Sequence, residues 1–183
     1  MDSAARAFFY PSLFYNVTLE KLRIRDWYNQ IEERIVLGAL PFKSTLEEVV
    51  KNLNVTHFLT LNEDHELQSF YPKPEDFSRH NCTVKRVKVC DFVGAPPIED
   101  IEEAVDFIDS VLKKDDKSVV YVHCKAGRSR SSMMLAAYFI RERGMTAQEA
   151  YDYMKSKRKH VDFHGLHWDT LKSYTEYLKS KQN

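Results

Sequence analysis

The stretch YVHCKAGRSRSS, residues 121–132, places a cysteine and two arginines between two kinds of secondary structure. The run SVVYVHC, residues 118–124, is almost entirely β-branched or aromatic before its histidine, which is typical of a central strand. A helix is predicted from Arg130 to Arg143, ended by Gly144. The residues between the strand and the helix are therefore predicted to form a tight loop at a helix N-terminus.

Such a loop can hold a tetrahedral oxyanion. Backbone N–H groups at a helix N-terminus point outward, and the helix dipole favours anions there. Gly127 permits a tight turn, and the planar guanidinium of Arg130 can bind two phosphate oxygens at once. The sequence therefore predicts a phosphate cradle with Cys124 at its base. Its predicted substrate-binding residues are consecutive: Lys125, Ala126, Gly127, Arg128, Ser129 and Arg130.

The position of Cys124 predicts a nucleophile. A thiol ringed by N–H donors and beside an arginine is expected to have a pKa well below that of a free cysteine, so it can attack as the thiolate. Ser131 can donate a hydrogen bond to the sulfur, and His123 is expected to brace the loop rather than to transfer protons. A lone cysteine is more often a packing residue, and that interpretation is kept for Cys82 and Cys90.

Composition limits the possible functions. The 183 residues suit one domain, and 27 Lys and Arg balance 27 Asp and Glu. A zero net charge gives no support to a nucleic-acid partner, so an anion site has to be local. Three cysteines without a CxxC pair argue against a disulfide framework and against zinc, and favour a reducing compartment. We expect a monomer with no metal and no cofactor.

Strand-like and helix-like patterns alternate along the chain. The predicted strands are 34–38, 57–62, 84–90 and 118–124. Besides the helix that follows the cysteine loop, helices are predicted near 44–52, 98–112, 146–157 and 167–181. Ser44 with Glu47 and Thr146 with Glu149 have capping-box spacing. The pattern predicts a single α/β domain with a central, largely parallel sheet of four to five strands flanked by helices.

The N-terminal segment, residues 1–25, is assigned apart from a catalytic domain of residues 26–183. No run of about 18 apolar residues occurs, so no membrane-spanning helix is predicted. The segment ARAFFYPSLFYNVTL (5–19) is aromatic and contains Pro11. Two interpretations stay open for its aromatic side chains: packing on the domain or contact with a membrane surface. The residues concerned are Phe8, Phe9, Phe14 and Tyr15.

The motif HCKAGRSRS, residues 123–131, resembles the signature of the cysteine-dependent protein tyrosine phosphatases, in their compact dual-specificity form. The resemblance implies a cysteinyl-phosphate intermediate without a metal. It makes Cys124 the nucleophile, Arg130 the phosphate clamp and Ser131 the group that helps the thiolate leave. The family also needs an aspartic acid that protonates the leaving oxygen, and VCDFVGAPP (89–97) offers Asp91. The alternative for Asp91 is an aspartate in a turn at a strand end.

Four further segments resemble the mitochondrial branch of this family that acts on phosphatidylglycerophosphate: 8–15, 26–42, 59–66 and 89–97. In NEDHE, residues 62–66, Glu63 and Glu66 match the acidic motif of that branch, and Asp64 and His65 depart from it. A carboxylate there can orient Arg130, and the alternative is an acidic surface turn.

The resemblance assigns to His167 a place that the family gives to a glutamine. The family tends to place a glutamine that positions the hydrolytic water in the region of VDFHGLHWDTL, residues 161–171. His167 occupies that place, so it is the candidate for positioning the water, and the alternative is that another residue does so.

The substrate class follows from the resemblance and from two basic residues of the loop. Lys125 and Arg128 add positive charge, which fits a substrate with more than one phosphate group; the alternative is that they face solvent. The resemblance implies hydrolysis of phosphatidylglycerophosphate for cardiolipin synthesis, at a lipid head group on the matrix face of the mitochondrial inner membrane. A dual-specificity protein phosphatase and a phosphoinositide phosphatase remain alternatives. A non-catalytic phosphate-binding module is disfavoured because Cys124, Arg130 and Asp91 are all present.

Overall fold

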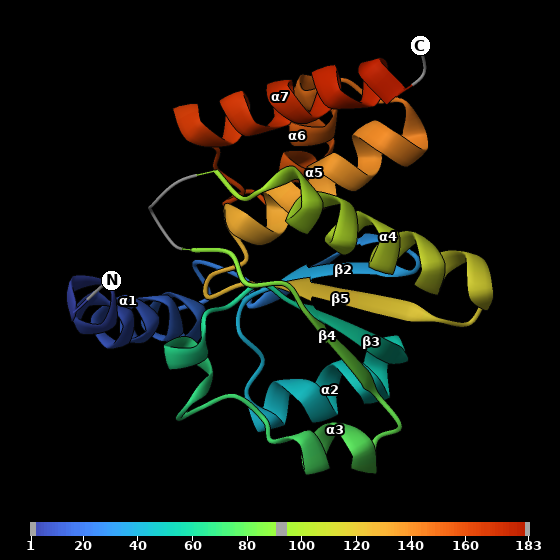
Figure 1. The fold of residues 1–183 in the computed structure, drawn as a ribbon. Coiled ribbons are helices and arrows are strands. Elements are labelled where there is room, and N and C mark those ends of the chain that lie inside the picture. Colours follow the sequence, from blue (N-terminus) through green and yellow to red (C-terminus); the bar gives the residue numbers. More distant parts are fainter. Residues whose placement is uncertain (1–2, 91–94, 182–183) are drawn as a thin grey trace.

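A five-stranded sheet in the order β1-β2-β5-β3-β4 organises the chain (Figure 1). The computed structural model describes residues 3–90 and 95–181, with side chains from Phe9 onward. The strands are β1 (Tyr28–Glu32), β2 (Ile35–Gly38), β3 (Val55–Thr60), β4 (Thr83–Arg86) and β5 (Val119–His123). β1 pairs antiparallel with β2, and every other pairing is parallel. The predicted α/β fold with a largely parallel sheet is confirmed.

Helices cover both faces of the sheet. The helical elements are α1 (Ser3–Lys21), α2 (Lys43–Leu53), the 3-10 turn η1 (Asp64–Leu67), α3 (Pro74–Arg79), α4 (Ile98–Lys114), α5 (Arg130–Arg143), α6 (Ala147–Lys157) and α7 (Gly165–Lys181). Figure 1 shows α4 to α7 on one face and α2 with α3 on the other. The five helices predicted from the sequence are confirmed, and α5 ends at Gly144, whose φ of 66° is the left-handed conformation that favours glycine.

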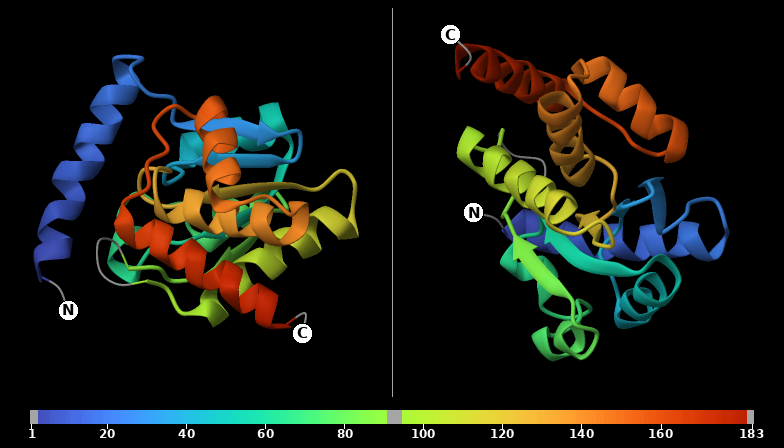
Figure 2. Two further views of the ribbon diagram at one scale, coloured as in Figure 1. Left: turned by 90° about the horizontal axis from the view of Figure 1, so that it is seen from above. Right: turned by 90° about the vertical axis from the view of Figure 1, so that its right-hand side faces the viewer.

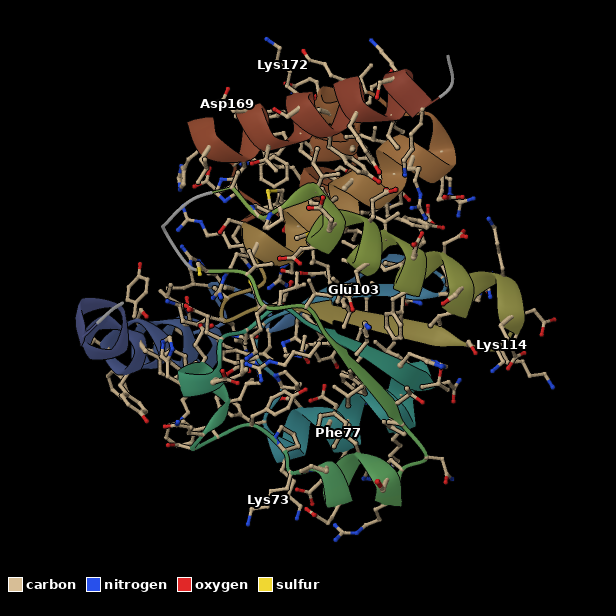
Figure 3. All side chains as sticks on the ribbon, in the orientation of Figure 1. Lys73, Phe77, Glu103, Lys114, Asp169 and Lys172 are labelled. Atoms are coloured by element: carbon tan, nitrogen blue, oxygen red, sulfur yellow. The ribbon has the colours of Figure 1, made fainter. Side chains whose placement is uncertain are left out.

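The sheet separates the two larger hydrophobic clusters of the core, one on each of its faces. All five residues of β5 are buried, so this strand is covered on both faces, as its apolar sequence predicts. Phe77 of α3 is buried against Phe58 on the α2–α3 face, with ring centroids 5.1 Å apart. Figure 3 shows Phe77 below the sheet, and Asp169 and Lys172 on the outer side of α7. The polar face of α7 therefore stays in solvent while its opposite face joins the core.

One capping prediction is confirmed and one is wrong. Thr146 accepts a hydrogen bond from the Glu149 N–H at 3.2 Å, and Glu149 accepts one from the Thr146 N–H at 2.7 Å. At α2, by contrast, the N-cap is Phe42, with no side-chain cap, and Ser44 already lies inside the helix. Phe42 stacks on Trp27 with ring centroids 5.1 Å apart, so aromatic packing fixes where this helix begins.

The N-terminal segment forms a helix that the sequence did not predict. α1 continues through Pro11, and Figure 2 shows it running along one side of the molecule. Phe9 and Leu13 are buried against Leu40, which follows β2. Burying such side chains is worth about 1.5–3 kcal/mol each, enough to offset the backbone hydrogen bond that a proline removes. Phe14, on another face, is 74% exposed.

Packing on the domain is observed for one of the aromatic residues, and membrane contact stays a prediction for the exposed ones. Phe9 packs on the domain, whereas Tyr15, like Phe14, is exposed. The side chain of Phe8 lies outside the described residues. Within the ranges that the structure describes, no helix combines the length and the apolar composition needed to cross a bilayer.

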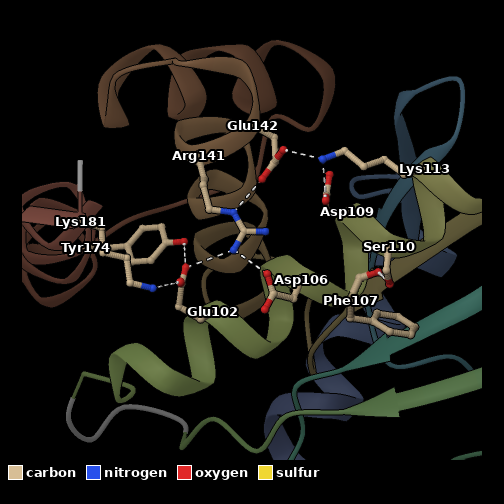
Figure 4. Close-up of polar contacts among 10 residues, drawn as sticks. All are labelled: Glu102, Asp106, Phe107, Asp109, Ser110, Lys113, Arg141, Glu142, Tyr174 and Lys181. Atoms are coloured by element: carbon tan, nitrogen blue, oxygen red, sulfur yellow. Dashed lines mark hydrogen bonds and ion pairs between the residues drawn. The ribbon is translucent and has the colours of Figure 1, made fainter. Parts of the chain in front are cut away.

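A cluster of ion pairs joins three helices on the α4–α7 face (Figure 4). Arg141 of α5 pairs with Glu102 at 3.2 Å and with Asp106 at 2.7 Å, both on α4, and with its neighbour Glu142 at 2.7 Å. Glu102 also accepts a hydrogen bond from Tyr174 of α7 at 2.5 Å. Burial by itself lowers the pKa of Arg141, but the carboxylates raise it above its ordinary value. The arginine therefore stays charged and links α4, α5 and α7.

Replacing this arginine should destabilise the fold. We expect Arg141→Met to lower the free energy of unfolding by about 1–3 kcal/mol, because it removes the cation that Glu102, Asp106 and Glu142 share. Urea unfolding followed by circular dichroism measures the change. Lys172→Met, on the exposed face of α7, is the matched control and should change the free energy by less than about 0.5 kcal/mol. Equal effects of the two substitutions would contradict a structural role for the cluster.

Candidate active site

The loop between β5 and α5 lies at the carboxyl end of the central strand. Gly127 has a φ of 61°, and a Cβ atom built there would lie 2.3 Å from the carbonyl oxygen of Gly38. Both the left-handed backbone and the contact with β2 thus require glycine at this position. The strand–loop–helix arrangement predicted around Cys124 is the one observed.

Each carbonyl from residue 125 to residue 129 has a hydrogen-bond donor outside the loop. The donors are Leu40 N to Lys125 O (3.2 Å), Arg158 Nη2 to Ala126 O (3.2 Å), Arg158 Nε to Gly127 O (2.8 Å), Asp162 N to Arg128 O (3.1 Å) and Met133 N to Ser129 O (2.8 Å). A trans peptide unit is planar, so the N–H of the next residue points away from each carbonyl. The amides of residues 126–130 therefore face the inside of the loop, as an anion cradle requires.

Arg158 holds two of these carbonyls with its side chain, and no sequence pattern pointed to it. It is 1% exposed, and besides the two loop carbonyls it binds Trp27 O at 3.2 Å and Asn29 Oδ1 at 2.6 Å. Burial lowers its pKa to about 10, so it remains charged at neutral pH. In the sequence it belongs to the basic run KSKRKH (155–160), which has the appearance of a solvated helix end.

Cys124 lies at the base of the loop and is 3% exposed. Ser131, in the first turn of α5, donates a hydrogen bond from its hydroxyl to the Cys124 sulfur at 3.3 Å. His123 is fully buried, and its Nε2 shares a hydrogen bond of 2.9 Å with Thr60 Oγ1. Burial lowers the pKa of His123 to about 3, so the ring is neutral at physiological pH. A neutral, tethered ring can support the loop but lacks the acidic proton that an imidazolium would supply.

Arg130 is held in place by a buried bidentate ion pair with Glu66. Nη1 lies 2.8 Å from Oε2 and Nη2 lies 2.9 Å from Oε1, and both residues are at most 3% exposed. Nη1 also donates to the carbonyl of Val89 at 3.0 Å. Burial by itself raises the pKa of Glu66, but Arg130 and the N–H of Glu63 lower it below its ordinary value. The guanidinium plane is thus fixed before any anion binds.

The carboxylates of the acidic segment NEDHE lie in different surroundings: some face the site and one lies on the surface. The Glu63 N–H donates to Glu66 Oε2 at 2.8 Å, and its side chain accepts a contact from Cys90 Sγ at 3.7 Å. Asp64 forms surface ion pairs with Arg86 at 2.6 Å and with Lys88 at 2.7 Å. The acidic-surface interpretation therefore fits Asp64 and is wrong for the buried Glu66.

Two other predicted residues have different outcomes. His167 is on α7, where its Nδ1 accepts a hydrogen bond from the His164 N–H at 3.0 Å. His164, rather than His167, lines the pocket above Cys124. The role of His167 in positioning the water stays a prediction, and the three-residue spacing of the two histidines gives no sign in the sequence of which one faces the loop. Asp91, the predicted acid, lies outside the described residues.

A pocket of about 170 Å³ opens above Cys124 and is walled by the cysteine loop, by α1 and by the turn after α1. Lys125 lines it and is 8% exposed, so it does not simply face solvent. Arg128 lines it too, but its guanidinium is ion-paired with Asp162. Among the residues with described positions, no group of three or more His, Cys, Asp or Glu side chains is arranged to hold a metal. The site is thus basic and open at one end.

Comparisons with known proteins agree with this geometry. Residues 37–177 match the family model for the dual specificity phosphatase catalytic domain. The human protein named phosphatidylglycerophosphatase and protein-tyrosine phosphatase 1 is 31% identical over 180 residues, 97% of this chain and 89% of its own. An Arabidopsis thaliana protein named phosphatidylglycerophosphate phosphatase PTPMT1 is 37% identical over 174 residues, 93% of this chain and 49% of its own. A crystal structure of PTPMT1 in complex with PI(5)P superposes with a TM-score of 0.79 at 28% identity, covering 86% of this chain and 100% of that one.

The buried pair predicts a pH-dependent effect of Glu66→Gln. A carboxylate whose pKa is lowered on folding stabilises the protein above its ordinary pKa of 4.5, and this contribution is lost as the pH falls through the folded value. At pH 7 we expect the variant to lose about 3–5 kcal/mol, because Arg130 keeps a buried charge without its partner. The difference from wild type should shrink at pH values below 4.5.

Urea unfolding at several pH values measures this difference. Glu75→Gln, which replaces an exposed carboxylate of α3, is the control and should give a small difference at every pH. A large difference for Glu66→Gln that stays constant from pH 7 to pH 3 would show that packing, rather than charge, accounts for the role of Glu66.

Proposed function

The chain belongs to the dual specificity phosphatase family, and from this premise we propose that it removes the terminal phosphate of phosphatidylglycerophosphate to give phosphatidylglycerol. The observation that carries the proposal is the similarity to relatives named for this activity, which extends over 97% of the chain in the human protein. The basic pocket above Cys124 supports it, because a head group with two phosphates needs positive charge beyond the cradle itself.

The first step forms a phosphocysteine. The Cys124 thiolate attacks phosphorus in line, so that an S–P bond forms as the bond from phosphorus to the leaving oxygen breaks. The amides of residues 126–130 and the guanidinium of Arg130 hold the equatorial oxygens, where the charge of the transition state is spread. Asp91 gives its proton to the leaving alkoxide of the glycerol, which would otherwise be too basic to depart.

The second step returns the enzyme to its starting state. Water attacks the phosphocysteine, Asp91 takes one of its protons, and the S–P bond breaks to release inorganic phosphate. The hydrogen bond from Ser131 stabilises the departing thiolate. Glu66 acts through Arg130 and is a positioning residue, as is His123, which holds the loop through Thr60. Among the candidates for positioning the water, His164 lines the pocket, whereas His167 does not.

The molecule reaches this substrate as a peripheral protein on a membrane. Among the described residues, eight large apolar side chains are exposed, and five of them come from α1 and the turn after it: Tyr10, Phe14, Tyr15, Leu22 and Ile24. Tyr15 itself lines the pocket, and the other four belong to the same helix and turn that wall it, so apolar side chains lie near the site where the head group binds. We assign residues 1–25 to this membrane-proximal segment and residues 26–183 to the catalytic domain, on the matrix face of the mitochondrial inner membrane by resemblance to the relatives.

A substrate panel tests the proposed reaction. We expect phosphate release from phosphatidylglycerophosphate in mixed micelles to exceed release from a phosphotyrosine peptide and from a phosphoinositide by at least about tenfold in kcat/KM, a difference of about 1.4 kcal/mol. Cys124→Ser should abolish release and leave the circular dichroism spectrum unchanged. A preference for the peptide would move the protein to the protein phosphatase function that the human relative's name also gives.

A substitution in the exposed apolar side chains of α1 should affect substrates in a membrane and substrates in solution differently. Phe14→Asp replaces the most exposed of these apolar side chains and should reduce kcat/KM on lipid in vesicles at least about fivefold, because it opposes insertion of α1. Hydrolysis of p-nitrophenyl phosphate should stay within about twofold of wild type. Val84→Asp, on β4 away from α1, is the matched control. Loss of activity on both substrates would point to misfolding instead.

A further inference from the structure

The face of α1 that turns toward the pocket carries polar and aromatic residues rather than apolar ones. Ser12, Tyr15 and Asn16 line the same pocket as Cys124. Their spacing of three and four residues puts them on one side of a helix, and the burial of Phe9 and Leu13 on the neighbouring side fixes that helix against the domain. The N-terminal helix therefore contributes a wall of the site, although the catalytic motif is more than a hundred residues away in the sequence.

Arg25 extends this wall just beyond the helix. Its side chain lines the pocket, and its backbone N–H donates to the carbonyl of Leu19 at 3.3 Å, which ties the residue to the end of α1. The guanidinium carbon lies 5.8 Å from the centroid of the Tyr15 ring, a cation–π distance. The side chain is half-buried, so the pocket wall restricts its position and part of its charge is shielded from solvent.

Arg25 differs from the other arginines of the pocket in its partners. Arg130 is paired with Glu66, and Arg128 is paired with Asp162. Within the described part of the chain, no carboxylate lies at ion-pair distance from Arg25, and its guanidinium lies over the face of the Tyr15 ring. An arginine held over an aromatic ring keeps its N–H donors free for an anion. Arg25 is thus the guanidinium that a second anionic group entering the pocket can pair with.

We propose that Arg25 binds the phosphodiester of the substrate while the cysteine loop holds the terminal phosphomonoester. This inference rests on the proposed function and names the residue that gives it substrate preference. The two phosphates of phosphatidylglycerophosphate are joined by one glycerol, so they enter one pocket together. The planar guanidinium matches the two non-bridging oxygens of a diester. A phosphotyrosine side chain offers no group for Arg25, which makes the residue a basis for discrimination.

The test compares a diester-bearing substrate with a simple monoester. The substrates are a short-chain phosphatidylglycerophosphate, used below its micelle concentration, and glycerol 3-phosphate, which has a similar leaving group and no diester. Arg25→Ala should lower kcat/KM on the first about 10- to 100-fold, mainly through KM, because a charge-assisted hydrogen bond is lost from uniform binding. On glycerol 3-phosphate the change should stay within about threefold.

Two variants and one binding measurement make the result specific. Lys21→Ala removes an exposed cation from the end of the same helix and should leave the ratio of the two kcat/KM values unchanged. Arg25→Lys should retain part of the preference, since a lysine keeps the charge and loses the bidentate geometry. Inorganic phosphate should bind Arg25→Ala and wild type with similar affinity, measured by calorimetry, which shows that the cradle is intact.

The outcomes separate this inference from the proposed function. A wild-type enzyme that prefers the diester-bearing substrate, with the preference lost in Arg25→Ala, supports the inference. A wild-type preference that survives in Arg25→Ala, or an equal loss on both substrates, overturns it and leaves the proposed function standing. A wild-type enzyme without any preference overturns both.

Discussion

The outward direction of five consecutive carbonyls is the constraint on which the site depends. A loop can point its amides at an anion only when its carbonyls point the other way and find donors there, because buried carbonyls without partners are costly. Those donors come from the segment after β2, from α5, from the end of α6 and from the chain before α7. The cradle is therefore a property of the whole fold, although its motif is only nine residues long.

Two buried arginines make this arrangement rigid in different ways. Arg130 points into the site and is oriented by a carboxylate, whereas Arg158 lies behind the loop and is satisfied by carbonyls and one amide oxygen. The desolvation of a buried charge is expensive unless its hydrogen bonds are complete. A carboxylate beside Arg158 would compete with the carbonyls for its donors, whereas the carboxylate of Glu66 orients the guanidinium of Arg130. Arg130, paired with a carboxylate, is oriented to bind phosphate, whereas Arg158, bound to carbonyls, supports the loop.

Local patterns predicted the elements next to the motif, and tertiary contacts decided the rest. β5, α5 and the cap of α6 follow from β-branched residues, from Gly144 and from Thr146, all of which act within a few residues of themselves. The predicted cap of α2 at Ser44 was wrong, because the helix begins after Phe42, which stacks on Trp27.

The same reason explains what the sequence missed in the site. Arg158 and His164 reach the loop only after α6 and α7 have packed, and nothing in their neighbourhoods distinguishes them from surface residues. The bidentate geometry of Glu66 with Arg130 also depends on the paired ends of β3 and β5, since Leu61 N–H binds His123 O at 3.0 Å. A family motif can indicate that a carboxylate is present, but its burial and its direction come from the fold.

The helix α1 shows the same limit, because Pro11 is tolerated only through the contacts of Phe9 and Leu13 with Leu40. That packing gives one helix three distinct faces: a buried face on the core, a polar face on the pocket and an apolar face in solvent. Under the proposed function, the head group of the substrate enters the site while the exposed apolar face of α1 contacts the bilayer. A rigid helix that is fixed to the domain sets the distance between the two.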